Sequence, residues 1–328
     1  MAAADQILEL GEVSKLQSMN SQPELPTGWD TTKIPDQSGR RFLITGGNSG
    51  LGLESAKALV AKGAHVTITA RSEIKGVAAM QSTGAQEFLE LDLADLASVR
   101  TAAAKITESF NVVFLNAGIM VPPFSKTVDG FESQLGTNFL GHFAFAGLIE
   151  KFVTDRWVVT TSFVHRFGNF GDQTKETIKN RCRGIGHYSP WVSYGDSKLA
   201  DLIFVNELER RRVNRGFGAI PLAAHPGWAH TNLTKRVSKA DLASRVNELV
   251  AVKIAQSAAE GALPLLCAAT LPGISQTAFL GPDKYFELKG SPKFTHGKAL
   301  AYDQRLATNL WQVAEELTGV AWENSPHA

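Results

Sequence analysis

Cysteine is scarce in this sequence, since Cys182 and Cys267 are the only two among 328 residues. Two cysteines are too few for a disulfide framework, and they lack the close spacing of metal ligands. No apolar run reaches the roughly 18 to 20 residues that a membrane-spanning helix needs, and the N-terminus lacks a signal-peptide pattern. These absences favour a protein without a membrane span in a reducing, cytoplasmic setting.

An excess of charge of one sign is also missing. The chain has 33 Lys and Arg against 32 Asp and Glu, for a formal net charge of +1. Proteins that bind nucleic acid usually carry a basic face or run. The densest basic stretch, ELERRRVNR at residues 207–215, ends a predicted helix, where cations complement the helix dipole. The composition therefore argues against nucleic acid as a partner.

After residue 40, short apolar runs alternate with segments of helical pattern. Runs rich in β-branched and aromatic residues are typical of parallel strands that are buried on both faces. The alternation predicts an α/β fold with one doubly wound parallel sheet of about seven strands and helices on both faces. The predicted strands are residues 41–45, 65–70, 87–93, 111–116, 156–162, 218–224 and 277–281.

This alternation spans residues 40–320, which we interpret as a single domain. Residues 1–39 are largely polar and punctuated by proline, a composition that predicts a loosely held N-terminal arm. Met19 is an alternative start, in which case residues 1–18 are a leader that is not native; the sequence leaves this open. Residues 321–328 are interpreted as a C-terminal tail.

A glycine-rich loop, TGGNSGLG at residues 45–52, lies between the first predicted strand and the first helix. Gly46, Gly50 and Gly52 permit a tight turn and a close approach of backbone N–H groups to a pyrophosphate at the helix N-terminus. Such a cluster also suits a plain turn, but its place after the first strand of an α/β chain favours dinucleotide binding. The same loop contains Asn48, Ser49 and Leu51.

The second predicted strand ends in Ala70 and Arg71, where a dinucleotide fold holds the adenosine ribose. An acidic residue there suits the ribose hydroxyls of NAD, whereas an arginine suits the 2′-phosphate of NADP. The sequence therefore predicts a preference for NADP, with NAD as the second option and with Ser72 and Asn48 as polar neighbours. The alternative, an arginine that merely ends a strand, stays open.

A tyrosine and a lysine four residues apart occur in SYGDSKLAD, at Tyr194 and Lys198. Residues at i and i+4 are neighbours on a helix surface, and a nearby cation favours phenolate over phenol. A tyrosine with an ordinary pKa of about 10 would then exchange protons closer to neutral pH, as a general acid/base does. The alternative is that Tyr194 caps the core and that Lys198 is solvated.

Several motifs occur together in one order along residues 40–281, and as a set they resemble the short-chain dehydrogenases/reductases. Within that superfamily the chain is most similar to the retinol dehydrogenase and WW-domain-oxidoreductase-like branch, without a WW domain. LNAG departs from the family, which often has a second asparagine there, and this departure affects packing more than chemistry. The motifs are TGGNSGLG, TAR, LDLADLASVR, LNAG, DGFESQLGTNFLGHF, VVTTS, SYGDSKLADLIF and HPGWAHT.

The resemblance implies a Rossmann-like fold and a catalytic set of Asn138, Ser162, Tyr194 and Lys198. In this set Tyr194 exchanges a proton with the substrate oxygen, and Lys198 lowers the pKa of the tyrosine and binds the nicotinamide ribose. Ser162 orients the substrate oxygen, and Asn138 holds a water that links Lys198 to solvent.

The assignment of the serine depends on the register of its strand. Ser162 follows two other hydroxyl residues, Thr160 and Thr161. We favour Ser162 because it closes the apolar strand, where a parallel sheet presents its catalytic groups.

The same resemblance implies further contacts with the cofactor. Asp92 and Leu93 would face the adenine, residues 116–118 the adenosine-side ribose, and Thr231 the nicotinamide carboxamide. Residues 116–118 are Asn116, Ala117 and Gly118 of the fourth-strand motif, and Pro226 and Gly227 of the HPG motif are the remaining contacts.

Two variable segments are candidates for the substrate site. Residues 163–193 form a long insertion before Tyr194, and long connections in compact domains are often functional. Its aromatic residues Phe167, Phe170 and Trp191 either line an apolar pocket or pack the insertion onto the sheet. Residues 228–256 correspond to the family's lid. These features predict a hydrophobic secondary alcohol or ketone, of steroid, retinoid or polyketide type, as substrate.

Other functions remain as alternatives. A regulatory or scaffold protein that binds the cofactor without turnover needs the glycines but has no need of the proton-transfer set. A nucleotide-sugar epimerase would need a glycine spacing that is absent here. His165 and His225 have no carboxylate or second histidine at ligand spacing, so we predict structural histidines and no metal. A homodimer is compatible with the sequence but is not required by it.

Overall fold

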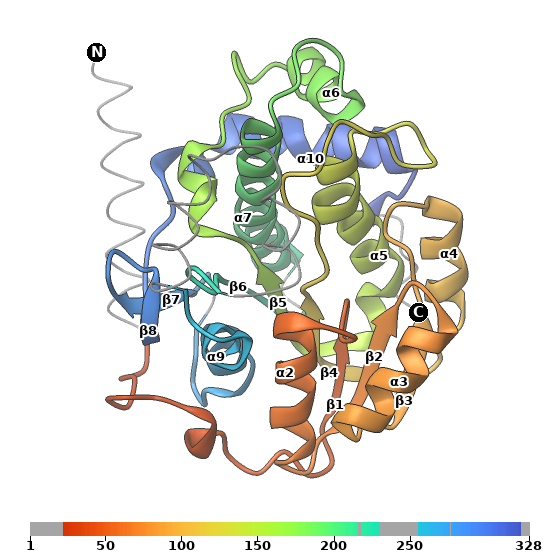
Figure 1. The fold of residues 1–328 in the computed structure, drawn as a ribbon. Coiled ribbons are helices and arrows are strands. Elements are labelled where there is room, and N and C mark those ends of the chain that lie inside the picture. Colours follow the sequence, from red (N-terminus) through yellow and green to blue (C-terminus); the bar gives the residue numbers. More distant parts are fainter. Residues whose placement is uncertain (1–21, 216–217, 230–254, 276, 323–328) are drawn as a thin grey trace, which may run out of the picture.

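The computed structural model describes residues 22–215, 218–229, 255–275 and 277–322 of the chain. Within them, eight strands form one sheet in the order β3-β2-β1-β4-β5-β6-β7-β8 (Figure 1). Neighbouring strands are parallel as far as β7, and β8 is antiparallel to β7. The strands are β1 (Arg41–Ile44), β2 (His65–Ala70), β3 (Glu87–Glu90), β4 (Phe110–Leu115), β5 (Val153–Thr160), β6 (Ile220–Ala224), β7 (Phe279–Lys284) and β8 (Lys289–Phe294).

Helices cover both faces of this sheet (Figure 1). One face is packed by α2 (Gly50–Val60), α3 (Glu73–Thr83) and α9 (Ala258–Thr270). The other is packed by α4 (Leu96–Ala104), α5 (Gly141–Ile149), α6 (Lys175–Arg183), α7 (Pro190–Arg215) and α10 (Gln304–Thr318). Short helical turns complete the fold: η1 (Thr31–Lys33), η2 (Leu135–Leu140), η3 (Glu150–Phe152), η4 (Phe163–Phe167) and η6 (Ala299–Tyr302).

The alternation of side chains along each strand produces two separate cores. Phe42 and Ile44 of β1 enter the core shared with α2 and α9, whereas Leu43 between them enters the core shared with α5 and α7. Because successive side chains of a strand point to opposite faces, a strand buried on both sides must be apolar throughout. The doubly wound α/β fold expected from the continuous apolar runs is therefore confirmed.

The eighth strand is the part of the sheet that the sequence pattern did not predict. β8 reads KGSPKF, and Pro292 is its only buried residue. An edge strand needs no apolar run, and proline and lysine are common at edges because they discourage further pairing. The sheet thus has one more strand than expected, and its last pair is antiparallel.

Both ends of the described chain pack against the domain. Trp29 and Ile34 are 1% and 2% exposed and belong to the core beneath α2 and α9. The described part of the N-terminal arm is therefore held by two buried side chains, although its polar composition suggested loose attachment. Near the other end Trp322 is fully buried among Phe143, Trp157, Phe204 and Trp311.

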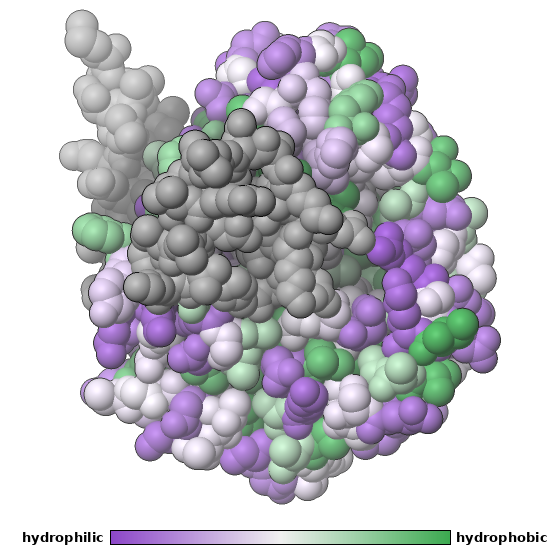
Figure 2. All heavy atoms as spheres, in the orientation of Figure 1, coloured by the Kyte–Doolittle hydropathy of each residue, from purple (hydrophilic) through white to green (hydrophobic). Residues whose placement is uncertain are grey.

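The described surface is mixed in character. Figure 2 shows hydrophilic and hydrophobic residues interspersed over the visible face. Among the described residues, no helix combines the length and the apolar character that a membrane crossing requires.

The order of the strands determines where a ligand can bind. The chain builds outward from β1 to β3, then returns to the other side of β1 and continues from β4 to β7. The reversal leaves a crevice beyond the carboxyl ends of β1 and β4, which is the usual ligand site of an open α/β sheet.

We predict that Trp322→Ala strongly destabilises the domain. The indole is fully buried, and its ring centroid lies 5.2 Å from that of Trp311 and 5.6 Å from that of Phe204. Removing a buried tryptophan side chain costs about 3 to 5 kcal/mol of unfolding free energy. Urea unfolding measures the loss, and Phe286→Ala, at a side chain that is 92% exposed, is the matched control. A loss below about 1 kcal/mol would contradict the packing.

Candidate active site

A cleft with a volume of about 860 Å³ opens at the reversal of strand order. It is lined by the loops after β1, β2, β4, β5 and β6 and by the first turns of α7. Most of the residues expected from the sequence line it, although they come from distant parts of the chain. They are Gly46, Asn48, Ser49, Gly50, Leu51, Arg71, Asp92, Leu93, Asn116, Ala117, Gly118, Ser162, Tyr194, Lys198, Pro226 and Gly227.

Three expected residues stand elsewhere, and a fourth lies outside the described residues. Gly52 packs behind the glycine loop, and Ser72 is the N-cap residue of α3. Asn138 is fully buried behind the wall of the cleft. Thr231 lies outside the described residues, as does most of the expected lid at residues 228–256.

The glycine loop shows why glycine is required at its positions. Gly46 and Gly50 have φ angles of 67° and 55°, in the left-handed region that other residues rarely adopt. A Cβ atom on Gly52 would lie 2.6 Å from the carbonyl oxygen of Gly46. Ser49 precedes α2, but its side chain makes no capping hydrogen bond. The first turn of α2 therefore presents backbone N–H groups to the cleft, and these can donate hydrogen bonds to an anion.

The far end of the cleft, beyond β2, is basic. Arg71 and Lys75 both line it, and Lys75 was not anticipated from the sequence. Asp92 is the only carboxylate among the described lining residues, and its Oδ1 already accepts a hydrogen bond of 3.0 Å from the Ala94 N–H. Arg71 precedes α3 and Lys75 lies in its first turn, and a guanidinium and an ammonium that line the same cleft suit a ligand with a phosphate at this end.

Thr45 joins the ends of β1 and β4 beside the glycine loop. Its Oγ1 accepts hydrogen bonds from the backbone N–H groups of Asn116 and Ala117, at 2.8 and 3.0 Å. The side chain of Asn116 donates to the Thr45 carbonyl at 2.9 Å. The two loops that border the crevice are thus fixed to each other by a residue that the sequence analysis did not single out.

His142 extends this network into α5. Its Nδ1 lies 2.8 Å from the carbonyl oxygen of Asn138, and its Nε2 lies 2.9 Å from Thr45 Oγ1. Since a carbonyl only accepts, Nδ1 carries the proton. In a neutral ring Nε2 is then an acceptor, and it shares the single hydroxyl hydrogen of Thr45 with the Phe114 carbonyl, 3.1 Å from Oγ1. Burial lowers the pKa of His142 to about 3, and the charge of Lys198 acts in the same direction. The imidazole is therefore neutral in the folded protein.

Asn138 occupies a π-helical turn, η2, immediately before α5. Its Oδ1 accepts from the Ile119 N–H at 2.8 Å, and its Nδ2 donates to the Ile119 carbonyl and to Ser197 Oγ, both at 3.0 Å. The side chain therefore ties the loop after β4 to α7. Wide π turns often mark functional positions in helices.

The three hydroxyl residues at the end of β5 point in different directions. Thr161 Oγ1 donates to the Lys198 carbonyl at 2.7 Å, so it is committed to α7. Ser162 Oγ accepts from the Val164 N–H at 3.2 Å, which leaves its own hydrogen free for a partner in the cleft. The hydroxyl of Thr160 has no hydrogen-bond partner. Thr160 also lines the cleft, so the choice of Ser162 from the strand register stays a prediction.

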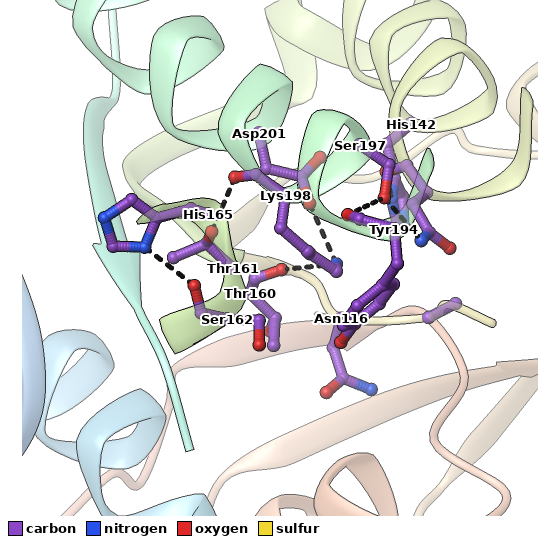
Figure 3. Close-up of polar contacts among 12 residues, drawn as sticks. Asn116, His142, Thr160, Thr161, Ser162, His165, Tyr194, Ser197, Lys198 and Asp201 are labelled. Atoms are coloured by element: carbon purple, nitrogen blue, oxygen red, sulfur yellow. Dashed lines mark hydrogen bonds and ion pairs between the residues drawn. The ribbon is translucent and has the colours of Figure 1, made fainter. Parts of the chain in front are cut away.

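Tyr194 and Lys198 lie one turn apart on α7, and both line the cleft (Figure 3). Lys198 is only 5% exposed. Its Nζ donates to the Thr160 carbonyl at 2.9 Å and to Asp201 Oδ2 at 2.8 Å. Burial by itself would lower the pKa of Lys198, but Asp201 and Tyr194 raise it above its ordinary value. The alternative of a solvated lysine is therefore wrong.

The insertion at residues 163–193 is more ordered than a long irregular loop, because it contains η4 and α6 and the start of α7. Two of its three aromatic residues take the expected roles, and the third takes neither. Trp191 lines the cleft, Phe170 is fully buried in the core, and Phe167 is 68% exposed. Phe163 and Val164, which were not anticipated, also line the cleft.

The two histidines next to the site are buried. His165 Nδ1 donates to the Ser162 carbonyl at 2.7 Å, and His225 Nδ1 accepts from the Gly227 N–H at 3.2 Å. The sequence showed no carboxylate near either, but the fold brings Glu287 Oε2 to 3.4 Å from His225 Nε2. The described residues contain no cluster of three or more potential metal ligands.

Comparisons with known proteins show what the chain as a whole is similar to. The family model described as short chain dehydrogenase matches residues 40–157. The short-chain dehydrogenase/reductase prx1 of Penicillium roqueforti is 36% identical over 250 residues, which are 73% of this chain and 72% of prx1. Human retinol dehydrogenase 12 is 32% identical over 298 residues, which are 87% of this chain and 88% of that protein.

A solved structure is similar over nearly the whole fold. The crystal structure of an uncharacterised protein from Mycobacterium paratuberculosis is 38% identical, with a TM-score of 0.76. The similarity covers 90% of this chain and 99% of that one.

We predict that His142→Gln reduces the dependence of stability on pH. The unfolded chain takes up a proton at His142 below about pH 6.5, whereas the folded protein does so only near pH 3. The contribution of this group is complete above pH 6.5 and is lost as the pH falls. Between pH 7.5 and 5.5 the wild type should lose about 1.4 kcal/mol more unfolding free energy than the variant.

Urea unfolding at these two pH values measures the difference. His187 is exposed, and His187→Gln is the matched control that keeps the wild-type pH dependence. The same pH dependence in His142→Gln as in the wild type would contradict a buried neutral imidazole.

Proposed function

The chain belongs to the short-chain dehydrogenase family, and we propose that it interconverts a hydrophobic secondary alcohol and its ketone with a nicotinamide dinucleotide. One observation carries the proposal: Ser162, Tyr194 and Lys198 line the same cleft as the glycine-bordered N-terminus of α2. A proton-transfer set and a phosphate cradle in one crevice are the requirements of this reaction.

The residues at the glycine loop fit a dinucleotide. Main-chain N–H groups at the start of α2 suit the pyrophosphate, because the tight contacts of Gly46 and Gly52 exclude side chains there. The basic pair of Arg71 and Lys75 suits a 2′-phosphate, which favours NADP over NAD. When bound, the nicotinamide group supplies or accepts the hydride.

The chain's own residues handle the proton. In reduction, Tyr194 donates its hydroxyl proton to the substrate oxygen, and in oxidation it removes the proton of the alcohol. Ser162 donates a hydrogen bond to the same oxygen, which orients the substrate and stabilises the charge that develops there. The Lys198 ammonium lies beside Tyr194 on α7 and stabilises the phenolate form.

Asn138 contributes from behind the cleft. Through Ile119 it holds the loop after β4, and through Ser197 it holds the helix that carries Tyr194 and Lys198. We retain Asn138 in the proposed catalytic set because its hydrogen bonds hold the loop after β4 and helix α7 in fixed positions relative to each other.

The substrate end of the cleft favours an apolar molecule. Met120, Phe163, Val164, Trp191, Trp228 and Leu288 line it. Retinol, the alcohol in the name of the human relative, is a hydrophobic primary alcohol. An activity assay should therefore use a panel of candidate substrates. The panel should include primary alcohols and aldehydes as well as secondary alcohols and ketones of steroid, retinoid and polyketide type.

A regulatory protein that binds the cofactor without turnover is the alternative function. Such a protein needs the glycine cradle but not a tyrosine held beside a buried lysine. Consumption of reduced cofactor in the presence of a ketone or aldehyde separates the two functions.

We predict that Tyr194→Phe keeps cofactor binding but lowers turnover at least about 100-fold, the usual scale for a positioned acid/base. The phenyl ring retains the packing and loses only the exchangeable proton. Absorbance of the reduced nicotinamide measures turnover, and fluorescence titration measures binding. Tyr188→Phe is the control, since Tyr188 donates to the Pro122 carbonyl and does not line the cleft. Turnover near that of the wild type would disprove the mechanism.

We predict that wild type prefers NADP(H) and that Arg71→Ala weakens NADP binding about tenfold or more while sparing NAD. A charge-assisted hydrogen bond contributes about 1.5 to 3 kcal/mol, and 1.4 kcal/mol corresponds to a factor of ten. Ala70→Asp should invert the preference, because a carboxylate accepts from the ribose diol and repels a 2′-phosphate.

Dissociation constants for both cofactors test this, with Lys57→Ala as the control because Lys57 pairs with Glu54 away from the cleft. Equal binding of NAD and NADP by wild type, unchanged in Arg71→Ala, would show that the assignment of Arg71 is wrong.

A further inference from the structure

Asp201 lies next to Lys198, one turn further along α7 (Figure 3). Its Oδ2 accepts a hydrogen bond of 2.8 Å from Lys198 Nζ, and both residues are almost fully buried, at 3% and 5% exposed. This carboxylate has no part in the proposed proton transfer.

The lysine is held at its backbone as well as at its side chain. Thr161 Oγ1 donates to the Lys198 carbonyl at 2.7 Å, and Lys198 Nζ donates to the Thr160 carbonyl at 2.9 Å. The end of β5 thus holds the lysine at two points, and Asp201 provides the third. Asp201 is the only charged partner among the three.

The charge matters because the ammonium is buried. A buried charge without a partner is costly, and a buried lysine in that situation releases its proton instead. Two of the three N–H donors of Lys198 are used by Thr160 and Asp201, which leaves one for a ligand in the cleft.

The other titratable groups near Lys198 do not replace Asp201. His142, on α5, is neutral in the folded protein because burial lowers its pKa to about 3. Tyr194, on the same helix, is negative only when it has lost its proton. Burial also raises the pKa of Asp201 to about 6, so near pH 7 and above it is still an anion.

We propose that Asp201 is a positioning residue that keeps Lys198 protonated and directs its ammonium between the end of β5 and the cleft. The consequence for catalysis rests on the proposed function, since a charged Lys198 is what supports Tyr194. The charge state of Lys198 itself can be measured without cofactor or turnover.

The experiment follows the titration of Lys198 in the protein without ligands. Lysine labelled with ¹³C at the ε position is titrated by NMR from pH 7 to 10.5, and Lys198→Met identifies the resonance. In the wild type the midpoint should lie above the ordinary lysine value, and Asp201→Asn should lower it by at least about one pH unit, because the buried ammonium then lacks its charged partner. Asp201→Glu should restore at least part of the shift.

Glu207→Gln is the matched control. Glu207 is also a buried carboxylate of α7, but it pairs with Arg210 and Arg211. This variant should leave the titration of Lys198 unchanged. If Lys198 titrates with the same midpoint in Asp201→Asn as in the wild type, the proposal is overturned.

A second measurement decides the case in which Asp201→Asn does not fold. Removing one partner of a buried ion pair is much more destabilising than removing both. Lys198→Met combined with Asp201→Asn should therefore fold, and should be more stable than Asp201→Asn alone. A double variant as unstable as the single one would show that Asp201 acts through something other than Lys198.

Turnover separates this proposal from the proposed function. At a pH above its lowered Lys198 midpoint, Asp201→Asn should lose at least tenfold in kcat/KM, and it should recover activity as the pH falls below that midpoint. A wild type without turnover on any substrate would count against the proposed function, and the Lys198 titration would still decide the role of Asp201.

Discussion

The contact between the end of β5 and the first turns of α7 supports the rest of the site. A parallel strand buried on both faces ends with carbonyl groups that need donors, and a buried lysine needs acceptors. Lys198 and Thr160 satisfy each other, and Thr161 satisfies the carbonyl of Lys198 in return. The helix is thereby attached to the sheet at the turn that carries Tyr194, and the side chain of Ser162 remains directed at the cleft.

A second set of hydrogen bonds fixes the opposite wall of the crevice. Thr45 joins the ends of β1 and β4, and His142 connects that junction to the turn that contains Asn138. Because Asn138 in turn bonds to Ile119 and Ser197, the two walls of the cleft are parts of one network of buried polar groups. Buried networks in which most members have partners hold their geometry well, because each lost bond leaves a costly orphan group.

Most of the site could be predicted from the sequence because its parts are local. The glycine loop, the Tyr194 and Lys198 pair, and Arg71 each depend on a few neighbouring residues and on the type of element that carries them. The contacts of Asp201 and Glu287 could not be predicted in the same way. Asp201 belongs to the SYGDSKLAD motif. However, the spacing of residues along a helix does not determine whether a lysine side chain points toward solvent or toward a carboxylate.

By itself the sequence determined the α/β class, the parallel arrangement of the apolar strands and many of the residues that line the crevice. The continuous apolar runs indicate strands that are buried on both faces, and the glycine motifs indicate backbone conformations that only glycine adopts easily. The tertiary structure alone decided the edge strand β8, the burial of Trp29 and Trp322, and the division of the insertion among core, cleft and solvent. These features depend on which surfaces come into contact when the chain folds. Neither the hydropathy pattern nor the spacing of residues along the chain predicts those contacts.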